Sequence, residues 1–183
     1  MSNLKIAIRV DSSLEMGSGH VMRCISLADE LKKNGGECIF ITRPQTGDLS
    51  LLLRMKGYKV HLLPQHNTNL TSISTEESSL DHADWLGCSW ELDAKQTLCA
   101  LTEIKPDWLI IDHYALDANW EVAVNPGDIK VMVVDDLADR PHECQLLLDQ
   151  NLGRKTEDYK ALVPNYCKCL VGPNRLLVKP QAQ

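Results

Sequence analysis

Residues 4–20 of the chain read LKIAIRVDSSLEMGSGH, and their pattern decides the fold class. The first seven residues are almost all apolar over the length of one strand, which is typical of a strand buried on both faces of a parallel sheet. After the loop that ends in Gly-Ser-Gly-His, apolar residues recur with the spacing of one helix face until residues 34–36 (NGG) end the helix. The apolar positions of this helix are Val21, Cys24, Ile25, Ala28 and Leu31. The stretch therefore predicts a strand, a glycine-containing loop and a helix.

The alternation of strands and helices continues along the rest of the chain. Further strands are predicted at residues 37–42, 58–62, 108–111, 129–134, 146–148 and 169–171. Helices are predicted at residues 48–56, 84–104 and 116–123, and the Ser- and Thr-rich residues 66–79 predict a loop. A helix that connects two parallel strands packs back onto the sheet, and this crossover is right-handed. We therefore expect one α/β domain with a Rossmann-like, doubly wound parallel sheet.

The composition argues against several classes of partner. The 183 residues carry a formal net charge of -6, and Lys and Arg are scattered along the chain. Such a chain repels a phosphate backbone and offers no basic face to anionic lipid, so we expect neither nucleic acid nor a membrane surface as a partner. No apolar run approaches the roughly 18 residues of a membrane span, and Arg9 and Asp11 interrupt the N-terminal apolar stretch. The expected location is cytoplasmic.

The seven cysteines contain no C-x-x-C pair of the zinc or redox kind, so we expect reduced side chains packed in the core. Cys167 and Cys169 would share one face of a strand, which a metal could use, but they are far from any pair of histidines. No H-E-x-x-H or comparable spacing occurs, which leaves a metal-dependent hydrolase as a weaker alternative. We predict no metal site.

Polar residues follow four of the predicted strands at the point where each strand ends. They are Asp11-Ser12-Ser13, Asp112-His113-Tyr114, Asp135-Asp136 and Asp149-Gln150-Asn151. The carboxyl ends of parallel strands meet at one edge of a sheet, where open α/β sheets bind their ligands. Asp and Asn are also common wherever a strand turns into a loop, so each residue alone has a structural alternative. Taken together, they predict a polar site at this edge.

Gly17-Ser18-Gly19-His20 lies between the first strand and the first helix. Glycines let the backbone approach a ligand, and the free N–H groups and dipole of a helix start attract phosphate, so we expect a diphosphate here. The dinucleotide fingerprint has a third glycine where Met22 stands, and its loop is shorter than the one that follows Asp11. The sequence therefore disfavours NAD, and we predict no cofactor.

His20 is the strongest candidate for proton transfer. The positive end of the helix dipole disfavours imidazolium, so we expect His20, at an exposed helix start, to be neutral and able to accept a proton. The structural alternative is a polar helix start without chemistry. The other histidines outside the strand ends are expected to have surface or loop roles, and they are His61, His66, His82 and His142.

Residues 9–24 (RVDSSLEMGSGHVMRC) resemble the opening R-x-D-x-S-x-x-x-G-x-G-H-x-x-R-C of the UDP-sugar hydrolases of the pseudaminic-acid pathway. Residues 110–114 (IIDHY), 134–136 (VDD) and 148–151 (LDQN) are similar to further motifs of that family, so the resemblance covers essentially the whole chain. These enzymes hydrolyse UDP-2,4-diacetamido-2,4,6-trideoxy-β-L-altropyranose to the free sugar and UDP, and they resemble two-domain glycosyltransferases of the GT-B type.

The resemblance has consequences for domain organisation. It implies that residues 1–172 form the sugar-side, N-terminal half of a GT-B-type fold. Residues 173–183 resemble the start of the crossover into a C-terminal, nucleotide-binding domain, which the chain lacks. The expected ligand is a UDP-sugar bound in the cleft between two such domains.

The resemblance also implies roles for individual residues. His20 would deprotonate a water that attacks the anomeric carbon with inversion, as the family assigns to its matching histidine. Asp11 would orient His20 or accept hydrogens from the sugar, and Tyr114 would offer the sugar an apolar face and a hydroxyl. The expected substrate-binding residues are Arg9, Ser12, Gly17, Ser18, Gly19, Arg23, Asp112, His113, Asp136 and Asn151. Arg9 and Arg23 have a structural alternative, as ion-pair partners of Asp11 or Asp136.

Two other functions remain open. A GT-B glycosyltransferase would use the same fold with an acceptor alcohol in place of water, and it usually carries a membrane-facing apolar patch that this sequence does not show. A non-catalytic sugar-nucleotide-binding fragment is the second alternative, because we expect these residues to contain only the sugar-side domain. Release of free sugar without an acceptor would separate hydrolysis from both.

Overall fold

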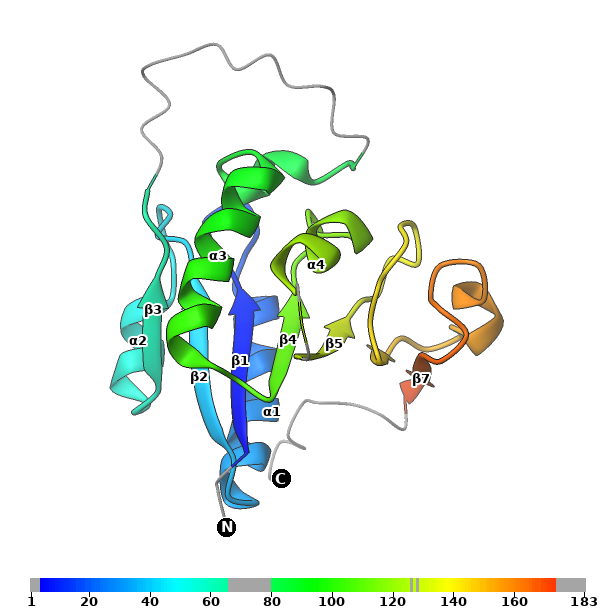
Figure 1. Cartoon of the computed structure of the whole chain (residues 1–183), viewed down its shortest axis with the longest axis horizontal. Helices are drawn as coiled ribbons and strands as arrows, with labels where there is room; N and C mark the ends of the chain where they lie inside the picture. The colour runs from blue at the N-terminus through cyan, green and yellow to red at the C-terminus, as the bar shows by residue number, and fades with distance from the viewer. Residues whose placement is uncertain (1–3, 66–79, 126, 128, 174–183) are drawn as a thin grey trace.

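The computed structural model describes residues 4–65, 80–125, 127 and 129–173, which form a single seven-stranded parallel sheet with helices on both faces (Figure 1). The strand order is β3-β2-β1-β4-β5-β6-β7. The strands are β1 (Lys5–Val10), β2 (Glu37–Thr42), β3 (Lys59–Leu62), β4 (Trp108–Asp112), β5 (Lys130–Val134), β6 (Leu146–Asp149) and β7 (Lys168–Val171). The predicted Rossmann-like α/β class is confirmed.

The order of the strands reverses its direction between β1 and β4. The chain winds outward from β1 through β2 to β3, and then returns to place β4 on the other side of β1. Ligands of open α/β sheets bind outside the carboxyl ends of the strands at such a reversal. In the register of this pair Val10 lies beside Asp112, so the polar residues that follow both strands meet at one place.

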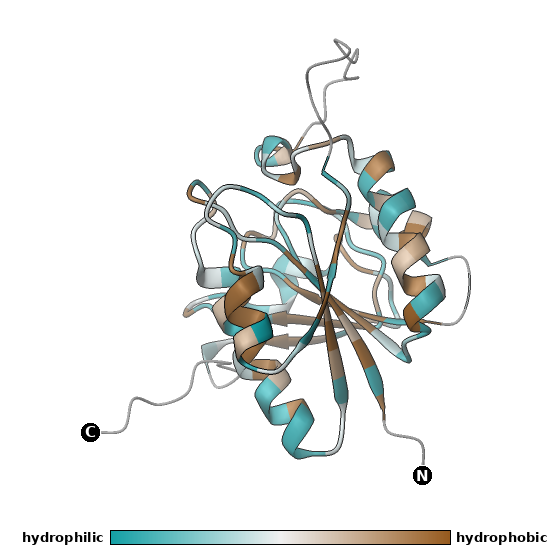
Figure 2. Cartoon of the chain, turned by 90° about the vertical axis from the view of Figure 1, so that its left-hand side faces the viewer, coloured by the Kyte–Doolittle hydropathy of each residue, from teal (hydrophilic) through white to brown (hydrophobic). Residues whose placement is uncertain are grey.

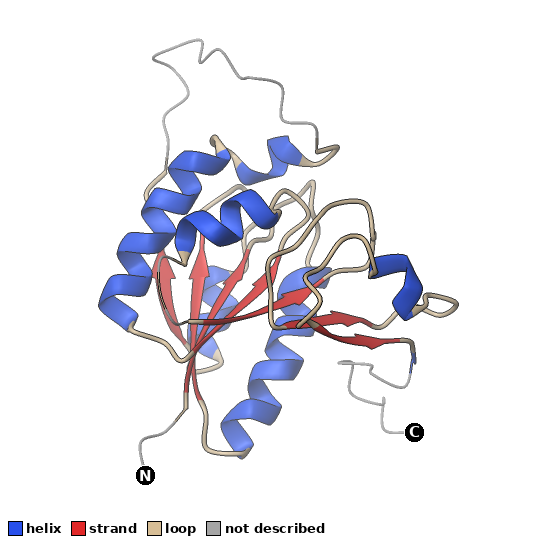
Figure 3. Ribbon diagram, turned by 45° about the vertical axis from the view of Figure 1, so that its right-hand side comes forward, coloured by secondary structure: helices blue, strands red, loops and turns tan. Residues whose placement is uncertain are grey.

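Two helical layers cover the sheet (Figure 3). One face packs against α3 (Trp90–Ile104) and α4 (Ala118–Val124), and the other against α1 (Gly19–Lys33) and α2 (Ser50–Met55). Side chains alternate between the faces of a strand, so Ala7 of β1 joins the α3 layer while Ile6 and Ile8 join the α1 layer. Figure 2 shows hydrophobic residues concentrated along the central strands. Burial on both faces explains why these strands are continuously apolar.

The predicted helix at residues 84–104 is two elements. A short 3-10 turn, η1 (Ala83–Leu86), ends at Gly87, whose φ of 70° lies in the left-handed region. α3 then begins after Ser89, whose hydroxyl accepts the backbone N–H of Leu92 at 3.3 Å. A left-handed glycine and a serine cap break the helix, although the apolar spacing continues across them. The other predicted helices and strands agree with the structure to within two residues, and η2 (Thr156–Tyr159) was not predicted.

Some sequence expectations for individual residues are wrong. His142, in the segment between β5 and β6, is buried and contacts Glu121 of α4, with 2.7 Å between Nδ1 and Oε1, so it has no surface role. All seven cysteines are free as expected, but Cys99 is exposed. The predicted loop at residues 66–79, which includes His66, lies outside the described residues, as does most of the predicted crossover at residues 173–183. None of the helices in the described part of the chain has the length and apolar character that crossing a bilayer requires.

Candidate active site

The loop after β1 turns back at Gly17 and leads directly into α1. The backbone N–H of Gly17 donates to the carbonyl of Ser13 at 2.9 Å, and Gly17 has a φ of +76°, which favours glycine. A side chain added at Gly17 or at Gly19 would meet no described atom within 4 Å. The capping residue Ser18 makes no side-chain cap hydrogen bond, and the first turn carries no acidic residue. The start of α1 is therefore open to an anion on the outer side of the loop.

His20 lies in the first turn of α1 and contacts the end of β4. Its Nδ1 is 2.6 Å from Oδ1 of Asp112. Arg23, three residues further along α1, donates from Nε and Nη2 to the two oxygens of Asp112, at 2.5 and 2.6 Å. The side chain of His20 is only 7% exposed, so the expectation that His20 lies in an exposed position is wrong, although Ser18 and Gly19 before it are exposed. Packing against Asp112 and Tyr114 removes it from solvent.

The short contact with Asp112 allows the tautomer of His20 to be assigned from the hydrogen-bond network. Two polar atoms 2.6 Å apart share a proton, and an ionised carboxylate cannot supply it, so the proton resides on Nδ1. Nη2 of Arg23 lies 3.2 Å from the same Nδ1, but both atoms are then donors and this contact is not a hydrogen bond. With that proton on Nδ1, Nε2 is the ring atom that can accept a further proton.

Asp112 is an ionised carboxylate in the interior of the protein. Burial alone would raise its pKa, but hydrogen bonds from Arg23 and His20, together with the charge of Arg23, outweigh burial and hold the pKa below its ordinary value. The thiol of Cys24 also donates to Oδ2, at 3.5 Å. Asp112 is therefore negative at neutral pH and can stabilise positive charge that develops on His20.

Tyr114 and Asp136 lie beside His20. The ring of Tyr114 meets the imidazole edge-on, with centroids 4.5 Å apart and planes at 83°. Burial and the neighbouring carboxylate of Asp136 raise the pKa of the Tyr114 phenol, so the hydroxyl stays protonated at neutral pH. Oδ2 of Asp136 accepts from Arg23 at 2.8 Å, whereas Oδ1 is buried without a hydrogen-bond partner of normal geometry among the described residues. The hydrogen bond between Asp136 and the Tyr114 hydroxyl contributes to the raised pKa of the phenol, so the two side chains form a pair beside His20.

A second ionic network lies under the same edge of the sheet. Oδ1 of Asp11 accepts from Nη1 of Arg9 at 2.5 Å and from the backbone N–H of Arg43 at 2.7 Å. Both arginines also donate to Asp93 of α3, each at 2.7 Å. The side chains of Arg9, Asp11 and Asp93 are wholly buried. These ion pairs connect the sheet edge to α3 and are closed to a ligand in this structure.

The alternation of side chains along the strands separates the two networks. Asp112 belongs to the face that packs on α1, where His20 lies, whereas Asp11 and His113 belong to the face that packs on α3. Within the described part of the chain, the carboxylate that contacts the ring of His20 is therefore Asp112 and not Asp11, which corrects the predicted orienting role of Asp11. His113 is fully buried, with Nε2 3.3 Å from Asp11, and burial lowers the pKa of its ring.

The remaining predicted residues are divided between the edge and the interior. The hydroxyl of Ser12 accepts the backbone N–H of Leu49 at 2.9 Å, so it supports the loop before α2. Asn151 is exposed at the edge and donates to the carbonyl of Asp136 at 3.1 Å. The predicted pairs Arg9–Asp11 and Arg23–Asp136 are both present. Arg43, which sequence reasoning missed, directly follows β2, so the same strand-end rule would have found it.

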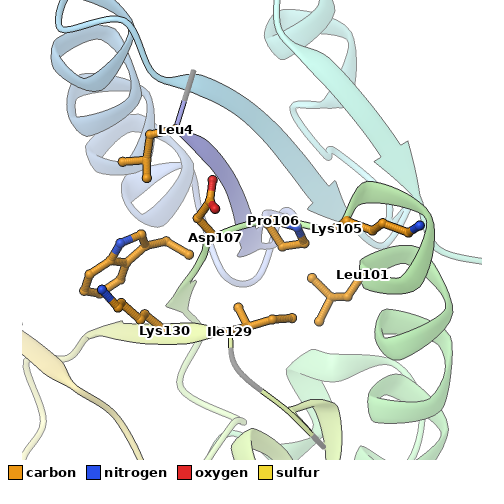
Figure 4. A pocket seen from close by; sticks show the side chains of 8 residues that line it. Leu4, Leu101, Lys105, Pro106, Asp107, Ile129 and Lys130 are labelled. Carbon is orange, nitrogen blue, oxygen red and sulfur yellow. The ribbon is translucent and has the colours of Figure 1, made fainter. Parts of the chain in front are cut away.

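An open hollow of about 760 Å³ lies in front of His20 at the carboxyl edge, and we call it the His20 hollow. Its lining includes Met16, Gly19, His20, Met22, Arg23, Trp85, Tyr114, Asp136 and Gln150. A second hollow, of about 560 Å³, lies at the amino ends of the strands, and Figure 4 shows the side chains around it. There Asp107 accepts the backbone N–H of Lys5, and Lys130 lies over the ring of Trp108. Of these two hollows, only the His20 hollow has both an oriented histidine and the start of a helix in its lining.

The described residues contain no group of three His, Cys, Asp or Glu side chains placed to hold a metal ion. Cys144 and Cys167 approach each other, with 3.6 Å between their sulfur atoms, and Cys169 lies on β7 beside them. The groups that surround the His20 hollow are side chains and the start of α1.

Comparisons of the sequence show two relatives and no matching family profile. The UDP-2,4-diacetamido-2,4,6-trideoxy-β-L-altropyranose hydrolase of Campylobacter jejuni is 26% identical over 179 residues, which is 97% of this chain and 53% of that protein. An uncharacterized protein of Methanocaldococcus jannaschii is 40% identical over 85 residues, which is 46% of this chain and 17% of that protein. The chain thus spans about half the length of the first relative, and its match covers a smaller share of the second.

Solved structures with the same fold have very different sequences. The crystal structure of Arabidopsis thaliana UGT89C1 complexed with quercetin has a TM-score of 0.64 at 12% identity, over 100% of this chain and 53% of that one. The crystal structure of Acinetobacter baumannii MurG has a TM-score of 0.57 at 10% identity, over 98% of this chain and 47% of that one. The chain thus has a Rossmann-like fold consistent with an N-terminal GT-B half, and its sequence is similar to that of a UDP-sugar hydrolase.

Proposed function

We propose that the chain is the sugar-side part of a hydrolase that converts UDP-2,4-diacetamido-2,4,6-trideoxy-β-L-altropyranose to the free sugar and UDP in pseudaminic acid biosynthesis. Residues 1–172 would form this part, and residues 173–183 would lead to a second domain that holds the nucleotide. The observation that carries the proposal is the pairing of His20 with Asp112 at the mouth of the His20 hollow. The similarity to the Campylobacter jejuni hydrolase supports the choice of substrate.

His20 is the base of the proposed reaction. Nε2 accepts a proton from a water molecule, whose oxygen attacks the anomeric carbon on the side opposite UDP. The bond between that carbon and the oxygen of UDP breaks, UDP leaves with the electron pair, and the sugar inverts its configuration. Asp112 stabilises the imidazolium that forms and holds Nδ1–H in place, which is the role of the buried carboxylate in a Ser-His-Asp triad.

The leaving group requires charge neutralisation more than a proton. Ordinary glycosidases protonate a poor alkoxide leaving group with a carboxylic acid, whereas a nucleoside diphosphate leaves as a stable anion. The open N–H groups and positive dipole at the start of α1 can stabilise that anion. Arg23 is already paired with Asp112 and Asp136, so it is not required for this task. One base and one helix start are therefore sufficient.

Tyr114 and Asp136 are proposed to position the sugar. The hydroxyl of Tyr114 is hydrogen-bonded to Asp136, so its oxygen can accept from an acetamido N–H while its ring lies against His20. The carboxylate of Asp136, which is also paired with Arg23, holds that hydroxyl in position. This pair beside the base would fix which face of the anomeric carbon the water reaches.

The proposal is tested by calorimetric titration of the chain with UDP and with the UDP-linked diacetamido sugar, followed by proton NMR of each mixture. Release of free sugar with the inverted anomeric configuration, without an added acceptor, would support hydrolysis. Sugar transfer only when an alcohol is added would support the glycosyltransferase alternative. If the chain binds neither compound, also when a nucleotide-binding domain is supplied, the proposal is wrong.

The substitution Asp112→Asn tests the orienting carboxylate. The new amide would offer one acceptor oxygen in place of two and could donate to Nδ1 of His20, which moves the ring proton to Nε2 and removes the base. We expect kcat for sugar release to fall by roughly 10²–10⁴, with little change in KM. The measurement is steady-state sugar release by NMR, with thermal unfolding to confirm the fold.

Asp107→Asn is the matched control, because Asp107 precedes the other end of β4 and its carboxylate accepts the backbone N–H of Lys5 far from His20. It should leave kcat within about twofold of the unsubstituted chain, since it changes no group at the His20 hollow. Equal kcat values for the Asp112 and Asp107 variants would show that Asp112 does not orient the base.

A further inference from the structure

Tyr114 belongs to an aromatic cluster beside His20, and the proposed mechanism gives no role to the other members of that cluster. The rings of Trp85 and Tyr114 are stacked, with centroids 5.9 Å apart and planes at 27°. His82 lies against both, with its centroid 4.4 Å from that of Trp85 and 5.3 Å from that of Tyr114. We call Trp85, His82 and Tyr114 the aromatic wall. His82 thus lies in a turn, as a loop role predicts, and packs against the other two rings.

The fold holds the aromatic wall in place. η1 carries Trp85, and its Leu86 is buried in the core while Gly87 ends the turn. The backbone carbonyl of Trp85 accepts from Nε2 of Gln45 at 2.9 Å, and its N–H donates to the carbonyl of His82 at 3.0 Å. The turn thus has anchors in the core and in the loop after β2, so the indole is presented at a defined position.

Trp85 is more exposed to solvent than a tryptophan of the core. Trp120 is completely buried, and its indole N–H donates to Asp93 at 3.0 Å. Trp85 is partly exposed and lines the His20 hollow. A partly exposed indole in a hollow that also holds an oriented base leaves apolar area for a ligand to cover.

We infer that Trp85 stacks against the apolar face of the sugar and selects for it, an inference that rests on the proposed function of the His20 hollow. A 6-deoxy sugar with two acetamido groups presents three methyl groups and ring C–H bonds, which favour an aromatic face. Trp85 stacks on Tyr114, which in turn contacts His20, so Trp85 lies near the base that deprotonates the attacking water. That position fits the sugar better than the uracil at the far end of the diphosphate.

The partners around the aromatic wall agree with a neutral, largely apolar ligand group. Arg140 lies over the ring of Tyr114 at 5.8 Å, but it is buried and paired with Asp135. Because its charge is already paired, Arg140 is not free to bind a phosphate group at the aromatic wall. The diphosphate is left to the start of α1 and to Lys56, which lines the same hollow away from the wall, and the methyl-bearing sugar to Trp85.

The test uses the free sugar, so that it is independent of turnover. Saturation-transfer NMR and chemical-shift titration are performed on the full chain with free 2,4-diacetamido-2,4,6-trideoxy-altrose and, separately, with UDP. In the unsubstituted chain we expect transfer to the sugar methyl protons and upfield shifts from the indole ring current. Trp85→Ala should weaken sugar binding about tenfold or more, Trp85→Phe should keep much of it, and UDP binding should not change.

Trp108→Phe is the control, because Trp108 lies at the amino end of β4 beside the other hollow. The inference is overturned if the sugar does not bind the unsubstituted chain, if Trp85→Ala binds it equally well, or if Trp85→Ala loses UDP binding to the same extent. If only the proposed function is wrong, the result differs. Sugar binding would still depend on Trp85, but the UDP-linked sugar would not be hydrolysed.

Discussion

Replacing His20 with alanine is expected to lower kcat for sugar release by roughly 10²–10⁴, because general-base catalysis supplies about this much rate. The structure identifies Nε2 as the atom that accepts the proton, since Nδ1 is held by Asp112 at 2.6 Å. Binding of the UDP-linked sugar should change much less than kcat, because the imidazole acts on the water. The measurement is the rate of sugar release by NMR, together with calorimetric binding.

The control for this experiment must account for burial. His20 is 7% exposed and contacts Asp112, so its removal also takes one hydrogen bond from a buried carboxylate. His20→Gln keeps a polar side chain and should show the same loss of kcat. His61→Ala, on the edge strand β3, should retain activity. Turnover by His20→Ala at the unsubstituted rate would contradict the role of the base.

Replacing Asp93 with alanine is expected to cause the largest loss of stability, about 3–5 kcal/mol of the free energy of unfolding. Asp93 accepts from Arg9 and Arg43, each at 2.7 Å, and from the indole of Trp120 at 3.0 Å, all in the interior. Without it, the guanidinium of Arg9 keeps the carboxylate of Asp11, whereas that of Arg43 keeps only neutral acceptors on Pro64 and Gln96 among the described residues. Since domains are stable by only about 5–15 kcal/mol, the variant should unfold in mild denaturant.

The pH dependence of stability provides an independent check on Asp93. Burial by itself would raise its pKa, but the charge and hydrogen bonds of Arg9 outweigh burial and leave the pKa below its ordinary value. A carboxyl group with a lowered pKa in the folded state stabilises the protein above its unfolded pKa of about 4. That stabilisation is lost as the pH falls through the folded pKa. Asp93→Asn should therefore flatten the decline of stability with acid.

The measurement is chemical denaturation between pH 7 and acid conditions. Glu91→Ala is the matched control, because Glu91 is exposed in the first turn of the same helix. It should change the free energy of unfolding by less than about 1 kcal/mol. An Asp93 variant as stable as the Glu91 variant would show that the buried network does not hold α3 to the sheet.

Local patterns in the sequence determined much of the fold. The continuous apolar runs of β1, β4 and β5 identify strands buried on both faces, because a residue in such a strand meets a helix whichever way it points. The spacing of apolar residues in α1 identifies a helix with one buried face. Gly87 and Ser89 carry the signals that divide η1 from α3, but the apolar spacing that continues across them obscured the break.

The sequence predicted the location of the candidate site and several residues that the structure brings together there, among them His20, Arg23 and Asp112, but not which of them pair. Strand-end residues and the loop before His20 place it at the carboxyl edge, because parallel strands end together. Which carboxylate meets His20 depends on the pairing of β4 beside β1 and on the face that each side chain takes. From the sequence alone, Asp112 and Asp11 are equally plausible partners of His20, because both follow a strand. In the structure they lie on opposite faces of the sheet.

Trp85 and Asp93 could be assigned only from the tertiary structure. Neither belongs to a strand end or a motif, and each acquires its role from residues distant in the chain, Tyr114 for the first and Arg9 for the second. The sequence by itself determined the elements, their order and the edge where chemistry is placed, because these depend on local periodicity and on general rules for parallel sheets. The tertiary structure decided which buried charges pair and which rings stack, because those contacts are made across the sheet and between segments that only folding brings together.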